Sequence, residues 1–218
     1  MEHPMDAFPD DARRVELANS LTHGLGTALA IAALVIMVVL AALKGTARHV
    51  VGVSIFGGCL VVLYATSTAY HALQSPGAKR IFHILDHAAI FLLIAGTYTP
   101  YCLATLRGAW GWSLFGVVWG LAALGVTLKA IFGPRRQWLS TLVYLAMGWI
   151  VLVALGPLAK SLPMGGLVTL FGGGAFYTAG VVFYAWKKLP YHHAVWHLFV
   201  ILGSTCHVMS VLFFVIPR

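Results

Sequence analysis

Seven long apolar segments follow one another along the 218-residue chain, separated by short polar stretches. Each has about 22–26 residues, enough for a helix to cross a hydrocarbon core about 30 Å thick. The pattern predicts an all-α, polytopic membrane protein, a seven-transmembrane-helix bundle forming a single domain over residues 16–218 after a polar tail at 1–15. The segments cover residues 20–43, 48–73, 81–106, 109–131, 138–159, 163–186 and 193–216.

Composition agrees with this class of protein. Hydrophobic residues make up 60% of the chain and charged residues only 9%, against roughly 25% charged residues in soluble domains. A net charge of +8 is compatible with a nucleic-acid partner. The lysines and arginines, however, stand singly or in small groups between apolar segments, so they are better explained as signals for membrane topology. The sequence therefore predicts no nucleic-acid binding.

The basic residues also predict an orientation. Intervals on the side of the N-terminus hold nine of them, and intervals on the opposite side hold five. Because positive charge is enriched in cytoplasmic loops, the N-terminus is expected in the cytoplasm and the C-terminus outside. The nine are Arg13, Arg14, Lys79, Arg80, Lys129, Arg135, Arg136, Lys187 and Lys188; the five are Lys44, Arg48, Arg107, Lys160 and Arg218.

A histidine pair opens the last apolar segment. His193 and His197 are four residues apart, so on a helix both imidazoles leave the same face and can hold one metal ion. Ionisable groups inside an apolar span are costly and therefore suggest a functional site. Packing between helices is the alternative for any single membrane histidine.

Further polar residues fall near the same membrane face in the predicted topology. Asp86 is the only carboxylate after the first sixteen positions. The first span enters the membrane with three polar residues, the second ends with two, the third starts with Asp86, and the seventh starts with the histidine pair. Spacings of three, four or seven residues also keep these groups on common helix faces. The candidates are Glu16, Asn19, His23, Ser67, His71, Asp86, His193 and His197.

The residue types indicate a chemistry. Three neutral imidazoles, from His71, His193 and His197, with water in the fourth position make an open tetrahedral zinc site, which lowers the pKa of that water to about 7. Asp86 is placed to accept the proton of the water and return it to a leaving group. Ser67 is a candidate for orienting that water or a substrate carbonyl. The sequence thus predicts metal-assisted hydrolysis inside the bilayer, with zinc preferred over manganese or iron.

Several residues have competing interpretations. His83 and His87 form a second pair four residues apart around Asp86, as candidate ligands or as side chains at the level of the lipid headgroups. Glu16 and Asn19 suit structural roles, such as capping the first helix. His207 lies about 15 Å deeper than His197 at 1.5 Å per residue, which argues against a place in the same site. The glycines of segment 163–186 favour close helix packing over phosphate binding.

The order and spacing of these residues resemble a known family. Glu16-x-x-Asn19-x-x-x-His23, Ser67-x-x-x-His71 with Asp86, and His193-x-x-x-His197 are similar to the three motifs of the hemolysin III family. This family is the bacterial branch of the progestin and adiponectin receptor superfamily. The resemblance implies a seven-helix bundle in the bacterial inner (plasma) membrane. It also implies zinc on the residues matching His71, His193 and His197, with Asp86 contacting it through water.

Three functions stay open at this point. The first is a zinc-dependent hydrolase acting on a lipid amide or acyl substrate, which is ceramidase-like by resemblance to receptor members. The second is a metal-containing membrane sensor or regulator of membrane fluidity or energetics without turnover. The third is a haemolytic pore factor, although no single helix carries a continuous polar face.

Overall fold

The computed structural model describes residues 9–133 and 137–217. Residues 1–8, Arg135, Arg136 and Arg218, on which part of the predicted tail and of the charge count depends, lie outside these ranges. The described residues contain no strand. They form α1 (Pro9–Lys44), α2 (Ala47–Ala72), α3 (Pro76–Pro100), a π-helix (Tyr101–Leu106), α4 (Gly108–Phe132), α5 (Gln137–Trp149), a 3₁₀ helix (Ile150–Ala154), α6 (Leu155–Ser161), α7 (Met164–Ala185), α8 (His192–Ser210) and a second π-helix (Val211–Val215).

Seven stretches of the described chain are long and apolar enough to cross a membrane. The predicted fold class, a polytopic seven-helix bundle, is therefore confirmed. Leucines recur every fourth residue on the outer face of α1, at Leu17, Leu21, Leu25 and Leu29, and all four are exposed. An exposed apolar stripe of this kind suits contact with lipid tails rather than with water.

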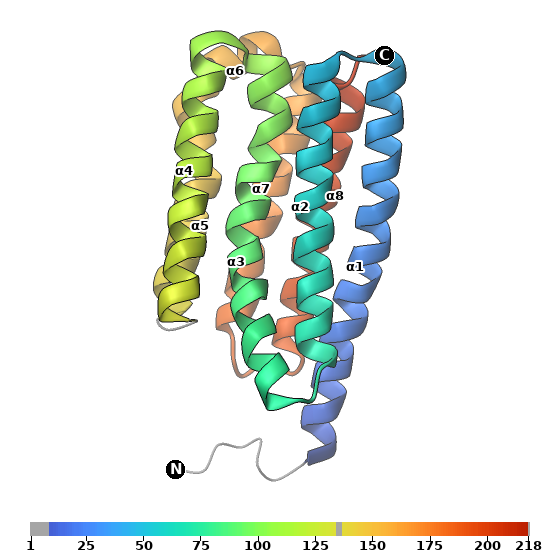
Figure 1. Cartoon of the computed structure of the whole chain (residues 1–218), viewed down its shortest axis with the longest axis vertical. Helices are drawn as coiled ribbons and strands as arrows, with labels where there is room; N and C mark the ends of the chain where they lie inside the picture. The colour runs from blue at the N-terminus through green and yellow to red at the C-terminus, as the bar shows by residue number, and fades with distance from the viewer. Residues whose placement is uncertain (1–8, 134–136, 218) are drawn as a thin grey trace.

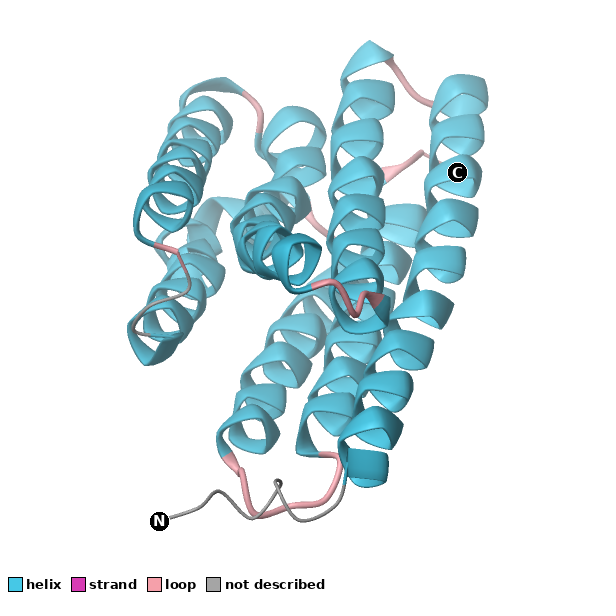
Figure 2. Cartoon of the chain, turned by 60° about the horizontal axis from the view of Figure 1, so that its bottom comes forward, coloured by secondary structure: helices cyan, strands magenta, loops and turns pink. Residues whose placement is uncertain are grey.

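The helices run side by side along the long axis of the molecule (Figure 1). The most extensive packing joins α1 to α2, α2 to α3 and α7 to α8, and α8 also packs against α1. Figure 2 shows the same bundle tilted so that one end comes forward, with short loops joining the helices. Segments from the two ends of the sequence, α1 and α8, therefore meet in one wall of the bundle.

The fifth span is composite. A 3₁₀ helix separates α5 from α6, which changes the backbone hydrogen-bonding pattern within the membrane. The Tyr98 hydroxyl of α3 donates to the carbonyl of Gly148 (2.6 Å) and accepts from the amide of Val151 (2.9 Å). A side chain from a neighbouring helix thus satisfies backbone groups that cannot reach water inside a membrane.

The first helix starts earlier than its apolar segment. It begins at Pro9, so residues 9–15 of the polar stretch are helical, and Glu16 and Asn19 lie inside the helix. The alternative that these two residues cap the first helix is therefore wrong. Because the helix extends before residue 20, Glu16 lies on α1 next to the end of α2, where its carboxylate contacts His71.

One end of the bundle gathers the elements that bear the candidate site. The start of α1, the α2–α3 connection and the α7–α8 connection all lie at the lower end in Figure 1, opposite the C-terminus. The last turn of α2, the first turns of α3 and the first turns of α8 meet there. Candidate residues from four helices thus share one depth.

Candidate metal centre

Three histidines from two helices converge at this end. His71 lies in the last turn of α2, and His193 and His197 lie in the first two turns of α8. One nitrogen from each ring lies within 4.8 Å of the others. The ring centroid of His71 is 5.1 Å from that of His193 and 5.2 Å from that of His197. The centroids of His193 and His197 are 4.6 Å apart. The structure therefore brings together the three residues that the sequence singled out as ligands.

These rings share a feature that fits a metal. The Nε2 atoms of His71, His193 and His197 are all buried and have no hydrogen-bond partner among the described residues. A buried polar atom without a partner is costly, so three in one place need an explanation. The donor set therefore fits a divalent metal with imidazole ligands, and zinc in particular.

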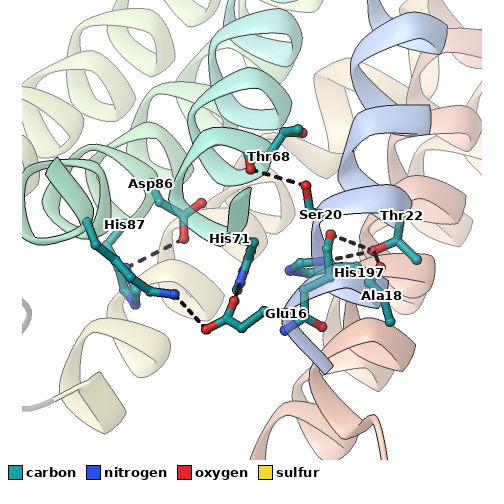
Figure 3. A network of polar contacts seen from close by, with 11 residues as sticks. Glu16, Ala18, Ser20, Thr22, Thr68, His71, Asp86, His87 and His197 are labelled. Atoms are coloured by element: carbon teal, nitrogen blue, oxygen red, sulfur yellow. Dashed lines mark hydrogen bonds and ion pairs between the residues drawn. The ribbon is translucent and has the colours of Figure 1, made fainter. Parts of the chain in front are cut away.

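Glu16 determines which ring nitrogen of His71 carries the proton. Its Oε2 lies 2.6 Å from His71 Nδ1 (Figure 3). Its Oε1 lies 2.7 Å from Lys79 Nζ. Because a carboxylate only accepts hydrogen bonds, Nδ1 of His71 carries the proton and donates it. The lone pair of the neutral ring is then on Nε2, which is buried and has no partner among the described residues. Such a carboxylate–histidine pair is the usual support of a metal-binding imidazole.

The backbone of α1 does the same for His197. Its Nδ1 donates to the carbonyl of Asn19 (3.2 Å) and lies 3.0 Å from Thr22 Oγ1. The Thr22 hydroxyl donates within its own helix, to the carbonyls of Ala18 and Asn19 (both 2.9 Å). Its oxygen is therefore available to accept from His197, whose lone pair again falls on Nε2.

His23 packs behind the three histidines and is not one of them. Its ring stacks on His197 with centroids 3.4 Å apart and planes 13° from parallel, and its edge meets Tyr64 at 5.0 Å. The ring is 1% exposed. His23 therefore packs against the His197 ring, and its role as a supporting residue stays a prediction.

Asp86 lies in α3, close to the site but outside the ligand group. Its side chain is buried, and it lines the same cavity as His193. The buried hydroxyl of Ser67 lies beside this carboxylate, without a hydrogen bond of standard geometry to a described residue. Asp86 Oδ2 is also 3.8 Å from His87 Nδ1. The carboxylate of Asp86 thus borders the cavity beside the histidines.

The competing pair, His83 and His87, does not join the three histidines. The His83 ring stacks on Tyr70, with centroids 4.8 Å apart. His87 Nδ1 donates to the carbonyl of His83 (2.9 Å), and its ring lines the cavity beside Asp86. The two residues therefore flank the acid, and the structure does not favour them as ligands.

An elongated cavity leads away from this site. It is bordered by Asp86, His87 and His193 at one end and by Tyr101 and Leu158 towards the other. From His193 to His207, both in its wall, α8 rises about 21 Å at 1.5 Å per residue. Most of the lining is aliphatic or aromatic. The cavity is therefore long and mostly apolar along its walls.

Two contacts of the site were not found from the sequence. Thr22 accepts from His197, and Lys79 donates to Glu16. Spacing offered a signal for both, because Thr22 lies three residues after Asn19 and Lys79 lies seven before Asp86. Neither residue type is rare enough in membrane proteins for that signal to stand out.

The fold and the site together define a polytopic membrane protein with a candidate metal centre at one end of its bundle. Residues 12–208 match the family model described as Haemolysin-III related, so the chain belongs to this family. It is 46% identical over 202 residues to Hemolysin-3 of Bacillus cereus, covering 93% of this chain and 92% of that protein. The Hemolysin-3 homolog of Bacillus subtilis is 46% identical over 199 residues, with 91% and 93% covered.

A more distant likeness extends beyond bacteria. The human monocyte to macrophage differentiation factor is 26% identical over 163 residues, covering 72% of this chain and 67% of that protein. This likeness supports the place of the family in the progestin and adiponectin receptor superfamily. The family predicted from the three motifs is thus confirmed.

Proposed function

We propose that the protein is a zinc-dependent intramembrane hydrolase acting on a lipid amide or acyl substrate. The observation that carries this proposal is the meeting of three buried, unpartnered Nε2 atoms with a buried carboxylate at the mouth of one apolar cavity. A purely structural cluster has no need for three unpaired ring nitrogens, because helix packing is stabilised by polar groups that pair.

His71, His193 and His197 would hold the metal through Nε2. Glu16 accepts from Nδ1 of His71 and the Asn19 carbonyl accepts from Nδ1 of His197, so two of the three rings are fixed in orientation. A zinc ion with three imidazole ligands leaves one position open and lowers the pKa of a water there to about 7. Imidazole ligands in a tetrahedral set favour zinc over the harder manganese ion.

Asp86 would move the proton. Its carboxylate accepts the proton of the attacking water as the oxygen adds to the substrate carbonyl carbon. When the bond from that carbon to nitrogen or oxygen breaks, Asp86 returns the proton to the departing atom. Ser67, beside Asp86, would orient the substrate carbonyl or the water. Burial of both groups within the bundle keeps bulk water from competing for these contacts.

The cavity supports a lipid as the substrate. Its mostly apolar walls extend from the level of Asp86 for about 20 Å along α8. This length is sufficient for an acyl chain, since one leaflet of a hydrocarbon core is about 15 Å deep. A single acyl chain would lie along the cavity with its carbonyl at the histidines. In this position the amide or ester bond of the lipid would lie next to Asp86, the proposed general acid.

Elemental analysis of the detergent-purified protein tests the metal centre. We expect about one zinc per chain in the wild type and none in the His193→Ala/His197→Ala double variant. Circular dichroism and size-exclusion profiles check that the double variant keeps its fold. A folded wild type that takes up no metal when supplied with zinc would overturn the proposal.

Replacing Asp86 separates catalysis from a sensor or regulator without turnover. The Asp86→Asn variant should keep its zinc, since Asp86 is not a ligand, and lose about 10²–10⁴-fold in lipid hydrolysis, the usual contribution of a general acid–base. Release of fatty acid from lipid amides and esters in mixed micelles is the measurement. Hydrolysis at the wild-type rate in this variant would exclude the assigned role.

A haemolytic factor is the second candidate, because the two Bacillus relatives at 46% identity bear the name Hemolysin-3. Release of haemoglobin from red cells and conductance of protein-containing planar bilayers test it directly. Conductance that survives in the His193→Ala/His197→Ala variant would favour a pore over the hydrolase.

We also propose that the protein lies in the inner (plasma) membrane of a bacterium with its N-terminus in the cytoplasm. The excess of basic residues on that side, nine against five, supports the orientation, and the Bacillus relatives support the compartment. The metal centre would then face the cytoplasmic leaflet.

A further inference from the structure

A second polar group lies deeper in the bundle than the metal centre. It consists of Tyr64, Tyr177, Ser204 and His207, which we call the deep polar cluster. Ser204 Oγ lies 2.8 Å from the Tyr64 hydroxyl and 2.8 Å from the Tyr177 hydroxyl. The His207 ring packs on Tyr177 with centroids 5.3 Å apart. His207 is ten residues beyond His197, about 15 Å along the helix, so the cluster is not part of the metal site.

The three hydroxyl groups leave one proton unused. Tyr64 donates to Ser204, and either Tyr177 or Ser204 donates in the second bond. Each hydroxyl carries a single proton, so two bonds among three groups leave one donor without a partner among the described residues. When Ser204 donates to Tyr177, the free proton belongs to Tyr177.

His207 also has unused hydrogen-bonding capacity. Its side chain is buried, and its Nδ1 has no partner among the described residues. Gly173 of α7 makes room for this ring, because a Cβ at that position would lie 2.6 Å from His207 Nε2. Gly203 does the same for Tyr177, whose ring would lie 2.4 Å from an added Cβ. Two close approaches of backbone thus place two polar rings together in an apolar interior.

Both rings border the cavity that begins at the metal centre. Tyr177 and His207 are part of its lining, together with Asp86 and His193. An unpaired polar group costs about 1–3 kcal/mol when buried, and no bulk water reaches the middle of a membrane to pair with it. A polar group in the cavity beside the Tyr177 and His207 rings would relieve part of this cost.

We propose that the deep polar cluster recognises a hydroxyl group carried in the middle of an acyl chain. This inference rests on the proposed function, since the occupant of the cavity is a lipid chain with its carbonyl at the histidines. A hydroxyl both donates and accepts, so it can pair with the imidazole of His207 and with the free proton of the tyrosine–serine group. An unsubstituted chain would leave both unpaired.

Binding of two matched fatty acids to the purified, zinc-loaded full chain tests the inference. Oleate and ricinoleate differ by one mid-chain hydroxyl, and displacement of a fluorescent fatty acid measures both. We expect ricinoleate to bind about five- to tenfold more tightly than oleate, the effect of one net hydrogen bond of about 1 kcal/mol or slightly more. His207→Phe, which keeps a planar ring, and Tyr177→Phe, which removes one hydroxyl, should each reduce this preference.

The outcomes separate the inference from the proposed function. Equal affinity of the wild type for the two fatty acids would overturn the hydroxyl site, with the cluster then satisfied by water alone, and would leave the lipid cavity intact. A preference that persists in both variants would overturn the assignment to these residues. Failure of both fatty acids to bind would overturn the lipid-binding cavity and the hydroxyl site together.

Discussion

A neutral imidazole binds a metal through one nitrogen when the other nitrogen carries the proton. In this protein neighbouring groups make the choice: Glu16 accepts a hydrogen bond from His71 Nδ1–H, and the Asn19 carbonyl of α1 accepts one from His197 Nδ1–H. Both partners come from α1, which supplies no ligand of its own. At the residue scale, the first helix therefore orients candidate ligands on two other helices.

Glu16 offers the clearest test of this role. Glu16→Ala removes the acceptor of His71 Nδ1–H and should weaken zinc affinity by about 10–100-fold, as loss of such a supporting group does elsewhere. Competition with a fluorescent chelator measures the affinity. Ser20→Ala, one turn further along α1, removes only a long 3.5 Å contact to the carbonyl of Thr68 and serves as the matched control. Equal affinity in the Glu16→Ala and Ser20→Ala variants would contradict the assignment.

Thr22 should matter less than Glu16. Thr22→Val removes the hydroxyl 3.0 Å from His197 Nδ1 but leaves the Asn19 carbonyl as an acceptor. Zinc affinity in the same chelator competition should fall by no more than about tenfold, the equivalent of one net hydrogen bond. A loss as large as that of Glu16→Ala would mean that the hydroxyl, rather than the carbonyl, holds the ring.

At the scale of elements, small residues decide how closely α7 and α8 approach. A Cβ added at Gly173 would meet the His207 ring. A Cβ added at the neighbouring Gly172 would have no atom within 4 Å. The sequence predicted close packing for the glycine-rich segment as a whole. The structure assigns that role to particular glycines, because a Cβ at Gly173 or Gly180 would meet side chains of α8, whereas a Cβ at Gly172 would meet nothing.

The two neighbouring glycines make a matched pair for stability. Gly173→Ala forces a methyl group to within 2.6 Å of the His207 ring and should destabilise the bundle by about 1–3 kcal/mol, the usual cost of overpacking. Gly172→Ala adds a methyl group in open space and should be neutral or stabilising by up to about 1 kcal/mol, through helix propensity. Denaturant unfolding in detergent micelles compares them. Equal free energies of unfolding for the two variants would show that α7 and α8 can move apart to accommodate the methyl group without destabilising the bundle.

Much of the element-scale picture was available from the sequence, for identifiable reasons. Apolar length predicts each span, and the spacing of His193 and His197 predicts a shared face because both depend on helix geometry alone. The 3₁₀ interruption at Ile150–Ala154 was not predicted, since it depends on the Tyr98 hydroxyl of another helix. The early start of α1 was missed as well, because polar residues outside the apolar core carry little hydropathy signal.

Convergence of four helices is a property of the whole molecule. Sequence position and an alternating topology suffice to place Glu16, His71, Asp86 and His193 at one depth. They do not fix which residues touch, because helix rotation and tilt are set by packing. Thus the three-histidine group was predictable, whereas the position of Asp86 beside Ser67 and His87, and the cavity behind it, required the three-dimensional structure.

The orientation of the protein in the membrane would decide which leaflet supplies the proposed lipid substrate. With a cytoplasmic N-terminus, an odd number of spans places the C-terminus outside and the metal centre near the cytoplasmic leaflet. Alkaline phosphatase, which is active only outside the cytoplasm, should therefore be active when fused after the last residue. It should be inactive when fused in the α7–α8 connection, after Lys188, which is the control on the opposite side. The reverse pattern would put the histidines at the outer leaflet, and lipids of that leaflet would then be the substrates to test first.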